Sequence, residues 1–148
     1  MTIIIRLLGS PQIEKDGVRL EKLRTRKTMA LLAYLIRQAQ PVSRARLVHL
    51  FWGDFPEARG RRSLTVDLSY LSKHLPGLLE ADRLSIQFTP TTDCWVDTIL
   101  FTQLCQSAEQ AKLRPTNVIS DGAWETHEQH LQADKLTEAI SLYRDHFM

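Results

Sequence analysis

The sequence predicts an α+β fold: a winged helix-turn-helix with an N-terminal antiparallel sheet and a C-terminal β-hairpin wing, followed by an α-helical segment. Three observations predict it. Short apolar stretches interrupted by turn residues come first, three helical periodicities follow between residues 25 and 76, and an alternating apolar and polar stretch comes next. This order of sheet, three helices and hairpin is that of a winged helix.

The N-terminal sheet is predicted from two stretches and the turns around them. Thr2 to Leu8 is rich in Ile and Leu and is followed by Gly9, Ser10 and Pro11, which favour a turn. Pro11 to Glu14 and Val18 to Leu20 flank Asp16-Gly17, a strong signal for a tight hairpin. We therefore expect one strand and then a short antiparallel hairpin.

Two helices follow the predicted sheet. The first runs from Thr25 to Gln40, with apolar residues at helical spacing, and Pro41 ends it. Ser43 is placed to cap the second helix, because its hydroxyl can accept from a free N–H of the first turn. Trp52 continues the apolar face of this second helix, so we interpret it as a core residue rather than a base-stacking one.

The third helix, from Glu57 to Pro76, has two chemically different faces. Leucines recur at spacings of four, three and four and form one apolar stripe: Leu64, Leu68, Leu71 and Leu75. The opposite side is basic, hydroxylated or small: Arg59, Arg62, Val66, Ser69 and Lys73, with Tyr70 beside them. Such a face occurs on ordinary amphipathic helices, and it also suits a helix that lies in the major groove of DNA.

A C-terminal hairpin is predicted after the third helix. Residues Leu84 to Phe88 alternate apolar and polar, Thr89 to Asp93 are expected to turn the chain, and Cys94 to Val96 are expected to return. The turn contains no cation, so we expect this hairpin to contribute weakly to minor-groove binding.

Composition and charge narrow the class of protein. A chain of 148 residues that is 43% hydrophobic can bury one core and a small second unit. No apolar run reaches about 18 residues, so we expect a cytoplasmic protein, with Cys94 and Cys105 reduced. Residues 1–96 hold 15 Lys and Arg against 9 Asp and Glu, whereas residues 97–148 hold 4 against 8. The basic N-terminal part indicates a polyanionic partner.

The segment from Arg24 to Pro76 resembles the DNA-binding region of SARP-type transcriptional activators, which are OmpR-like winged helices. The features that carry the resemblance are the LLAYL helix, the VSR run from Val42 to Trp52, and the register of Ala58-Arg59 with the leucines that follow. The resemblance implies a sequence-specific DNA-binding regulator, an activator, with recognition helix 57–75 in the major groove and hairpin 84–96 as the wing.

The same resemblance implies a division of the chain. Residues 1–96 are expected to form the OmpR-like winged-helix DNA-binding domain. Residues 97–148 are expected to be the start of a TPR-like bacterial transcriptional activator domain, because Val96-Asp97, Phe101 and the stretch LTEAISLYRDHFM from Leu136 resemble its elements. Helix 123–147 has an apolar stripe, which we expect to pack within the chain or to support self-association.

Periodicity and resemblance together give the candidate DNA-binding residues: Arg44, Arg59, Arg61, Arg62, Thr65, Val66, Ser69, Tyr70, Ser72 and Lys73. Two departures weaken the pattern. Tyr70 and Ser72 stand where the family commonly has arginines, so bidentate contacts to guanine are not expected from these two positions. The expected partner is double-stranded DNA carrying direct repeats, and RNA polymerase is a candidate protein partner.

No catalytic, metal or cofactor site is predicted. The sequence contains no GxxxxGK[ST] or GxGxxG, and His127 and His130 form only an i,i+3 pair on a polar helix. The alternative to DNA binding is a winged helix used as a protein-protein interaction module, which the uncharged turn and the missing arginines favour. Under the DNA-binding interpretation the protein associates with the nucleoid.

Overall fold

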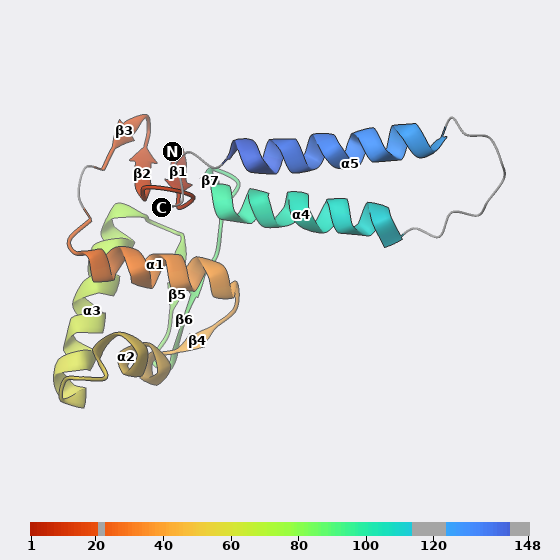
Figure 1. The fold of residues 1–148 in the computed structure, drawn as a ribbon. Coiled ribbons are helices and arrows are strands. Elements are labelled where there is room, and N and C mark those ends of the chain that lie inside the picture. The colour runs from red at the N-terminus through yellow and green to blue at the C-terminus, as the bar shows by residue number, and fades with distance from the viewer. Residues whose placement is uncertain (21–22, 114–123, 143–148) are drawn as a thin grey trace. The chain divides into compact units, whose positions relative to one another are not determined.

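The computed structural model describes residues 1–20, 23–113 and 124–142, without the side chains of 111–113 and 124–132. It divides into two compact units, one of Met1–Ile4 with Ile13–Trp95 and one of Ile5–Gln12 with Val96–Met148. We call these the first and the second unit. The elements (Figure 1) are, in chain order, β1 (Ile3–Arg6), β2 (Gln12–Lys15), β3 (Val18–Arg19), α1 (Arg26–Gln38), β4 (Val42–Ser43), α2 (Arg44–Trp52), α3 (Glu57–His74), β5 (Leu79–Ala81), β6 (Ser85–Phe88), β7 (Cys94–Val96), α4 (Asp97–Leu113) and α5 (Trp124–Ser141).

The chain has an α+β fold with two sheets, as predicted. One sheet has the strand order β3-β2-β1-β7, and the other has the order β4-β6-β5. The predicted N-terminal hairpin is confirmed, because β2 and β3 pair antiparallel with Glu14 opposite Arg19. Asp16 and Gly17 both have positive φ, 51° and 78°, which two-residue hairpin turns of this kind require.

The first two helices begin and end close to the predicted residues. Thr25 caps α1 by accepting from the N–H of Thr28, and the helix ends at Ala39, which has a left-handed φ of 52°. Ser43 caps α2 as predicted, accepting from the N–H of Arg46 at 3.2 Å. Trp52 is only 6% exposed, so its assignment to the core is confirmed.

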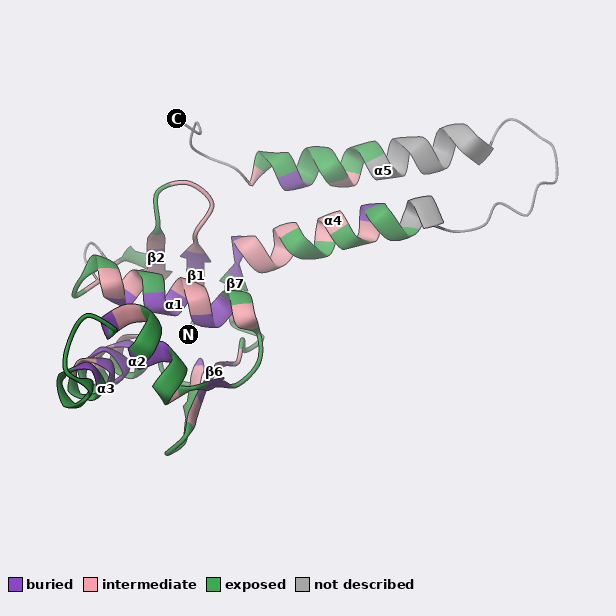
Figure 2. Cartoon of the chain, turned by 60° about the horizontal axis from the view of Figure 1, so that its bottom comes forward, coloured by how far each residue is buried: buried purple, intermediate pink, exposed green. Residues whose placement is uncertain are grey.

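Helix α3 buries its leucine stripe as predicted; Leu64, Leu68, Leu71 and Leu75 are at most 6% exposed. It packs against α2 at Gly60, where a Cβ would lie 2.7 Å from Cγ1 of Val48 and 3.1 Å from Cβ of Trp52. The two helices therefore approach each other at a point where only hydrogen fits. Figure 2 shows the buried stripe of α3 and its exposed opposite face.

The predicted hairpin of residues 84–96 is wrong. β6 pairs antiparallel with β5, with Leu79 opposite Phe88, and on its other edge with β4. β7 belongs to the other sheet. The hairpin that follows α3 is thus β5–β6, and its tip is Asp82 to Leu84 rather than residues 89–93. The physical reason is that β6, whose Ile86 and Phe88 are buried, is the central strand of its sheet. Val42 of β4 pairs with one of its edges, and β5 pairs with the other.

In the second unit, α4 begins at a buried carboxylate and packs against α5. Asp97 is 1% exposed, and its oxygens accept from the N–H of Leu7 at 2.8 and 2.9 Å and from that of Leu8 at 3.0 Å. Ala139 of α5 is buried, whereas Leu136 and Ile140 are 40% and 69% exposed. Of the predicted helix 123–147, residues 123 and 143–147 and the side chains of 124–132 lie outside the described residues.

Candidate nucleic-acid interface

The predicted site residues gather on the solvent face of α3 and at the start of α2. Eight of them are exposed: Arg59, Arg61, Arg62, Thr65, Val66, Ser69, Ser72 and Lys73. Tyr70 and Arg44 are half-buried. The helix periodicity explains the exposure, because these positions lie opposite the leucine stripe or on its flanks. Val66, 41% exposed, is the one large aliphatic side chain on the exposed face of α3.

The acidic residue in the middle of α3 is turned away from this face. Asp67 is 4% exposed, and its Oδ1 accepts from Nη1 of Arg24 at 2.9 Å. The other acid of the helix, Glu57, lies in its first turn and pairs with Arg61. From Ala58 to His74, α3 therefore presents no acidic side chain to solvent. Arg24 was not among the predicted site residues; the position of Asp67 beside the leucine stripe was the signal for a buried ion pair.

An aromatic residue between α2 and α3 orients one of the predicted cations. The guanidinium carbon of Arg59 lies 4.5 Å from the ring centroid of Phe55. The Nζ of Lys27 lies 5.6 Å from the same ring and 5.4 Å from that of Trp52. Cations held over aromatic faces gain a modest electrostatic attraction, which favours this position of the Arg59 guanidinium.

Tyr70 lies along the helix rather than projecting from it. Its ring stacks on His74 at a centroid distance of 4.1 Å and an angle of 28°, and Nδ1 of His74 lies 2.9 Å from the Tyr70 carbonyl oxygen. The pair forms a flat surface near the C-terminal end of α3. Ser69 and Lys73 are exposed on the neighbouring part of the helix.

The start of α2 is joined to the tip of the β5–β6 hairpin by Arg44. Its backbone N–H donates to the Leu84 carbonyl oxygen and its Nε to the Asp82 carbonyl oxygen, both at 2.8 Å. Asp82 closes the tip by accepting from the N–H groups of Leu84 and Ser85, each at 2.6 Å. These backbone hydrogen bonds, that from Ser85 first, lower the pKa of the Asp82 carboxyl, and the charge of Arg44 adds to the effect.

The hairpin tip carries a cation that the sequence interpretation missed. Arg83 and Leu84 lie at the tip and are exposed, Leu84 to 79%. The expectation of a cation-free tip followed from placing the turn at residues 89–93, and it is wrong for the same reason as the predicted pairing. The Asp82 side chain, which can bond to backbone N–H groups two and three residues on, was the available turn signal.

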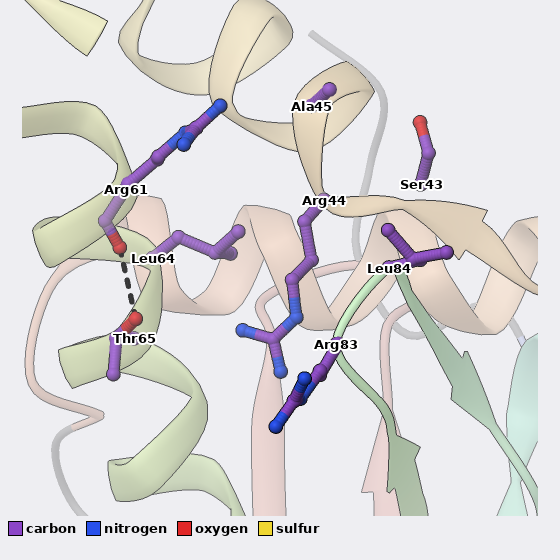
Figure 3. Close-up of a pocket in the computed structure, with 8 residues that line it drawn as sticks. All are labelled: Ser43, Arg44, Ala45, Arg61, Leu64, Thr65, Arg83 and Leu84. Carbon is purple, nitrogen blue, oxygen red and sulfur yellow. Dashed lines mark hydrogen bonds between the residues drawn. The ribbon is translucent and has the colours of Figure 1, made fainter. Parts of the chain in front are cut away.

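A hollow of about 590 Å³ lies between α2, α3 and this tip (Figure 3). Its lining residues are Ser43, Arg44, Ala45, Arg61, Leu64, Thr65, Arg83 and Leu84. Two of the predicted residues on α3, Arg61 and Thr65, thus meet Arg44 of α2 around one space.

The described residues contain no group of three or more His, Cys, Asp or Glu placed to hold a metal ion. The side chains of His127 and His130 lie outside them. Burial raises the pKa of the Cys94 thiol to about 11, so this thiol is protonated at neutral pH, and both Cys94 and Cys105 are free. Within the part of the chain that the structure describes, every helix is too short or too polar to span a bilayer.

Comparisons with known proteins support the fold. No protein-family model matches the sequence, and no curated protein sequence does. Among solved structures, the chain is similar to EmbR of Mycobacterium tuberculosis, solved in complex with a low-affinity phosphopeptide. The TM-score is 0.69 and the identity 22%, and the match covers 96% of this chain and 36% of EmbR. The chain therefore shares the fold of the matched part of EmbR and spans about a third of EmbR's length.

Proposed function

We propose that this chain is the DNA-binding part of a transcriptional regulator, an activator, and that α3 reads double-stranded DNA in the major groove. The observation that carries the proposal is the solvent face of α3, which has cations near both ends and is free of acid from Ala58 to His74. Contacts to phosphates are the dominant source of affinity for DNA, and an exposed carboxylate in the groove would be repelled by the phosphates. The fold shared with a SARP-family regulator supports the proposal.

The residues of α3 divide into two roles. Arg62 and Lys73 are long cations near opposite ends of the exposed face, where they can reach phosphates. Val66 and Ser69 lie between them, where a methyl group can contact thymine and a hydroxyl can contact a base edge. Arg61 is paired with Glu57 and Arg59 is held over Phe55, so we assign both to backbone contacts near the start of the helix.

The β5–β6 hairpin is assigned as the wing. In winged helices this element contacts the groove or the phosphates beside the recognition helix. Arg83 gives its tip a positive charge, and Arg44 anchors the tip to α2. We assign Arg44 the additional role of holding the wing in place.

Residues 97–148 are proposed to begin the TPR-like activator domain, with RNA polymerase as a candidate partner. Their net charge of −4, from 4 Lys and Arg against 8 Asp and Glu, makes them poor ligands for DNA. The exposed Leu136 and Ile140 on α5 are consistent with further contacts, to more of a longer protein or to a second copy. The proposed location is the cytoplasm, on the nucleoid.

The alternative function is a protein-protein interaction module. Leu84 at the hairpin tip and Leu50 on α2 are 79% and 51% exposed, which favours apolar contacts at these positions. The two functions differ in their response to salt.

A fluorescence titration of labelled 30-base-pair duplexes with the full chain tests the proposal. Binding should weaken steeply between about 50 and 200 mM salt, with a log-log slope set by the number of phosphates contacted. A variant with Arg62→Ala and Lys73→Ala should bind more weakly, and Arg37→Ala, an exposed arginine on α1, is the matched control. If the protein does not bind DNA at low salt, or if the double variant binds DNA as tightly as the original protein, the proposal is contradicted. The protein-protein interaction module is then the remaining function.

A further inference from the structure

The hollow at the hairpin tip is lined by several cations. Three of its eight described lining residues are arginines, and none is acidic. They come from three elements: Arg44 from α2, Arg61 from α3 and Arg83 from the turn between β5 and β6. Like charges brought together by a fold repel one another unless an anion lies between them.

Figure 3 shows how the three side chains lie. Arg44 extends from α2 into the space between α3 and the hairpin, and Arg83 extends from the hairpin into the same space. Arg61 points away from these two, toward α2. Its guanidinium is also paired with Glu57, so the anion-facing pair is Arg44 with Arg83.

The Asp82 carboxylate feels the charge of Arg44, but its hydrogen bonds go to the turn and not to either arginine. Asp82 uses its oxygens to accept from two backbone N–H groups and from the Ser85 hydroxyl. Arg44 donates to the Asp82 main-chain carbonyl through Nε alone, and no hydrogen bond among the described residues uses its two Nη groups. A guanidinium fixed through Nε presents its Nη groups as a fork, the geometry that matches phosphate oxygens.

We propose that this hollow is a phosphate-binding site in which Arg44 and Arg83 hold one phosphate group. The hydrogen bond from Arg44 to the hairpin tip holds its guanidinium in place for the phosphate. Arg83, which is exposed in the turn, contacts the phosphate from the other side. The inference deepens the proposed function, on which it rests for its natural source, a phosphodiester of the DNA backbone. The other source of the same chemistry is a free phosphate or a small phosphate-bearing molecule.

Inorganic phosphate is the first probe, because it tests the site without DNA. Arginine Nε–H resonances of the full chain are followed by NMR during a phosphate titration, with chloride at equal ionic strength as the control. The Arg44 and Arg83 signals should shift saturably in phosphate only, and Arg83→Ala should remove the Arg44 shift. Shifts no larger than that of Arg37, or equal in chloride, overturn the proposal.

The second probe assigns the source. Single phosphates of a selected duplex are replaced one at a time by uncharged methylphosphonates, and binding of the original protein, Arg83→Ala and Arg37→Ala is measured. At one phosphate position, the methylphosphonate should weaken DNA binding by the original protein and by Arg37→Ala about tenfold. It should hardly affect DNA binding by Arg83→Ala, because the change in the DNA and the change in the protein remove the same contact.

The outcomes separate the two proposals. Saturable phosphate shifts with no coupled position support the site and assign it to a free phosphate ligand rather than to DNA. Saturable shifts in a protein that binds no duplex also support the site, while the proposed function fails. The absence of saturable shifts refutes the phosphate site even if the protein binds DNA.

Discussion

Arg24 donates a hydrogen bond from Nη1 to Oδ1 of Asp67 at 2.9 Å, and the bond joins the segment before α1 to the inner side of α3. The Asp67 side chain is 5% exposed, whereas that of Arg24 is 46% exposed. The ion pair thus partners the one acid in the middle of α3, which is turned away from the solvent face of the helix.

Replacing Arg24 by Ala should destabilise the protein, because it leaves the Asp67 carboxylate buried without its partner. We expect a loss of about 1–3 kcal/mol in the free energy of unfolding, measured by urea denaturation. Arg26→Ala, an exposed neighbour, is the control and should change stability little. Adding Asp67→Asn to Arg24→Ala should restore part of the loss; equal stability of Arg24→Ala and the original protein would show that the pair is not structural.

Gly60→Ala should also destabilise the protein. The new methyl group would lie 2.7 Å from Cγ1 of Val48 and 3.1 Å from Cβ of Trp52, so the Val48 side chain or the two helices must shift. Overpacking of this kind costs about 1–3 kcal/mol, more than the helix propensity of at most about 1 kcal/mol that alanine adds. Thermal unfolding measures the change, with Ser72→Ala on the exposed face as control. A higher melting temperature for Gly60→Ala contradicts the close approach of the two helices.

The hairpin tip should respond to pH through Asp82. Its carboxyl pKa is lowered below the ordinary 3.8, because the ionised form accepts from backbone N–H groups. The turn is therefore held above that pKa and should loosen as the pH falls through it. The amide NMR signals of Leu84 and Ser85 should titrate with a midpoint below 3.8, and Asp82→Asn should abolish this titration. A midpoint at or above 3.8 is the contrary result.

Substitutions on the exposed face of α3 should distinguish residues that contact the DNA backbone from residues that contact bases. Arg62→Ala and Lys73→Ala should weaken binding to preferred and scrambled duplexes alike, and each should reduce the salt slope by about 1. Val66→Ala should cost about 1–3 kcal/mol on the preferred duplex alone. Tyr70→Ala also removes the stack on His74, so it is interpreted together with His74→Ala. Salt titrations of each variant on both duplexes provide the measurement; loss of preference in Arg62→Ala with an unchanged slope reverses the roles.

The sequence predicted the elements whose signals are local. Leucine spacing located α3, the Ser43 hydroxyl located the start of α2, and Asp16-Gly17 located the β2–β3 turn. The pairing of β6 was not predictable in the same way, because Val42 and Leu79 meet it from strands of two and three residues that show no periodicity.

The candidate site followed the same pattern. Helical periodicity was sufficient to place the α3 face in solvent. The contributions of Arg24 and Arg83 depend on contacts over long sequence distances or on the correct turn, so neither was found. Arg44 was predicted as a DNA-binding residue, and its bonds to Asp82 and Leu84 add an anchoring role that only the fold reveals.

The central claim, sequence-specific binding of DNA by α3, is tested most directly by selecting bound sequences from random duplexes at about 0.1 M salt, because affinity depends strongly on salt. The full chain should enrich a defined motif, as a direct repeat with about 10–11 base pairs between half-sites. Val66→Ala should enrich a motif altered at the position that this residue contacts. Failure of the original protein to enrich any sequence over the random pool, although it is folded, would contradict the account.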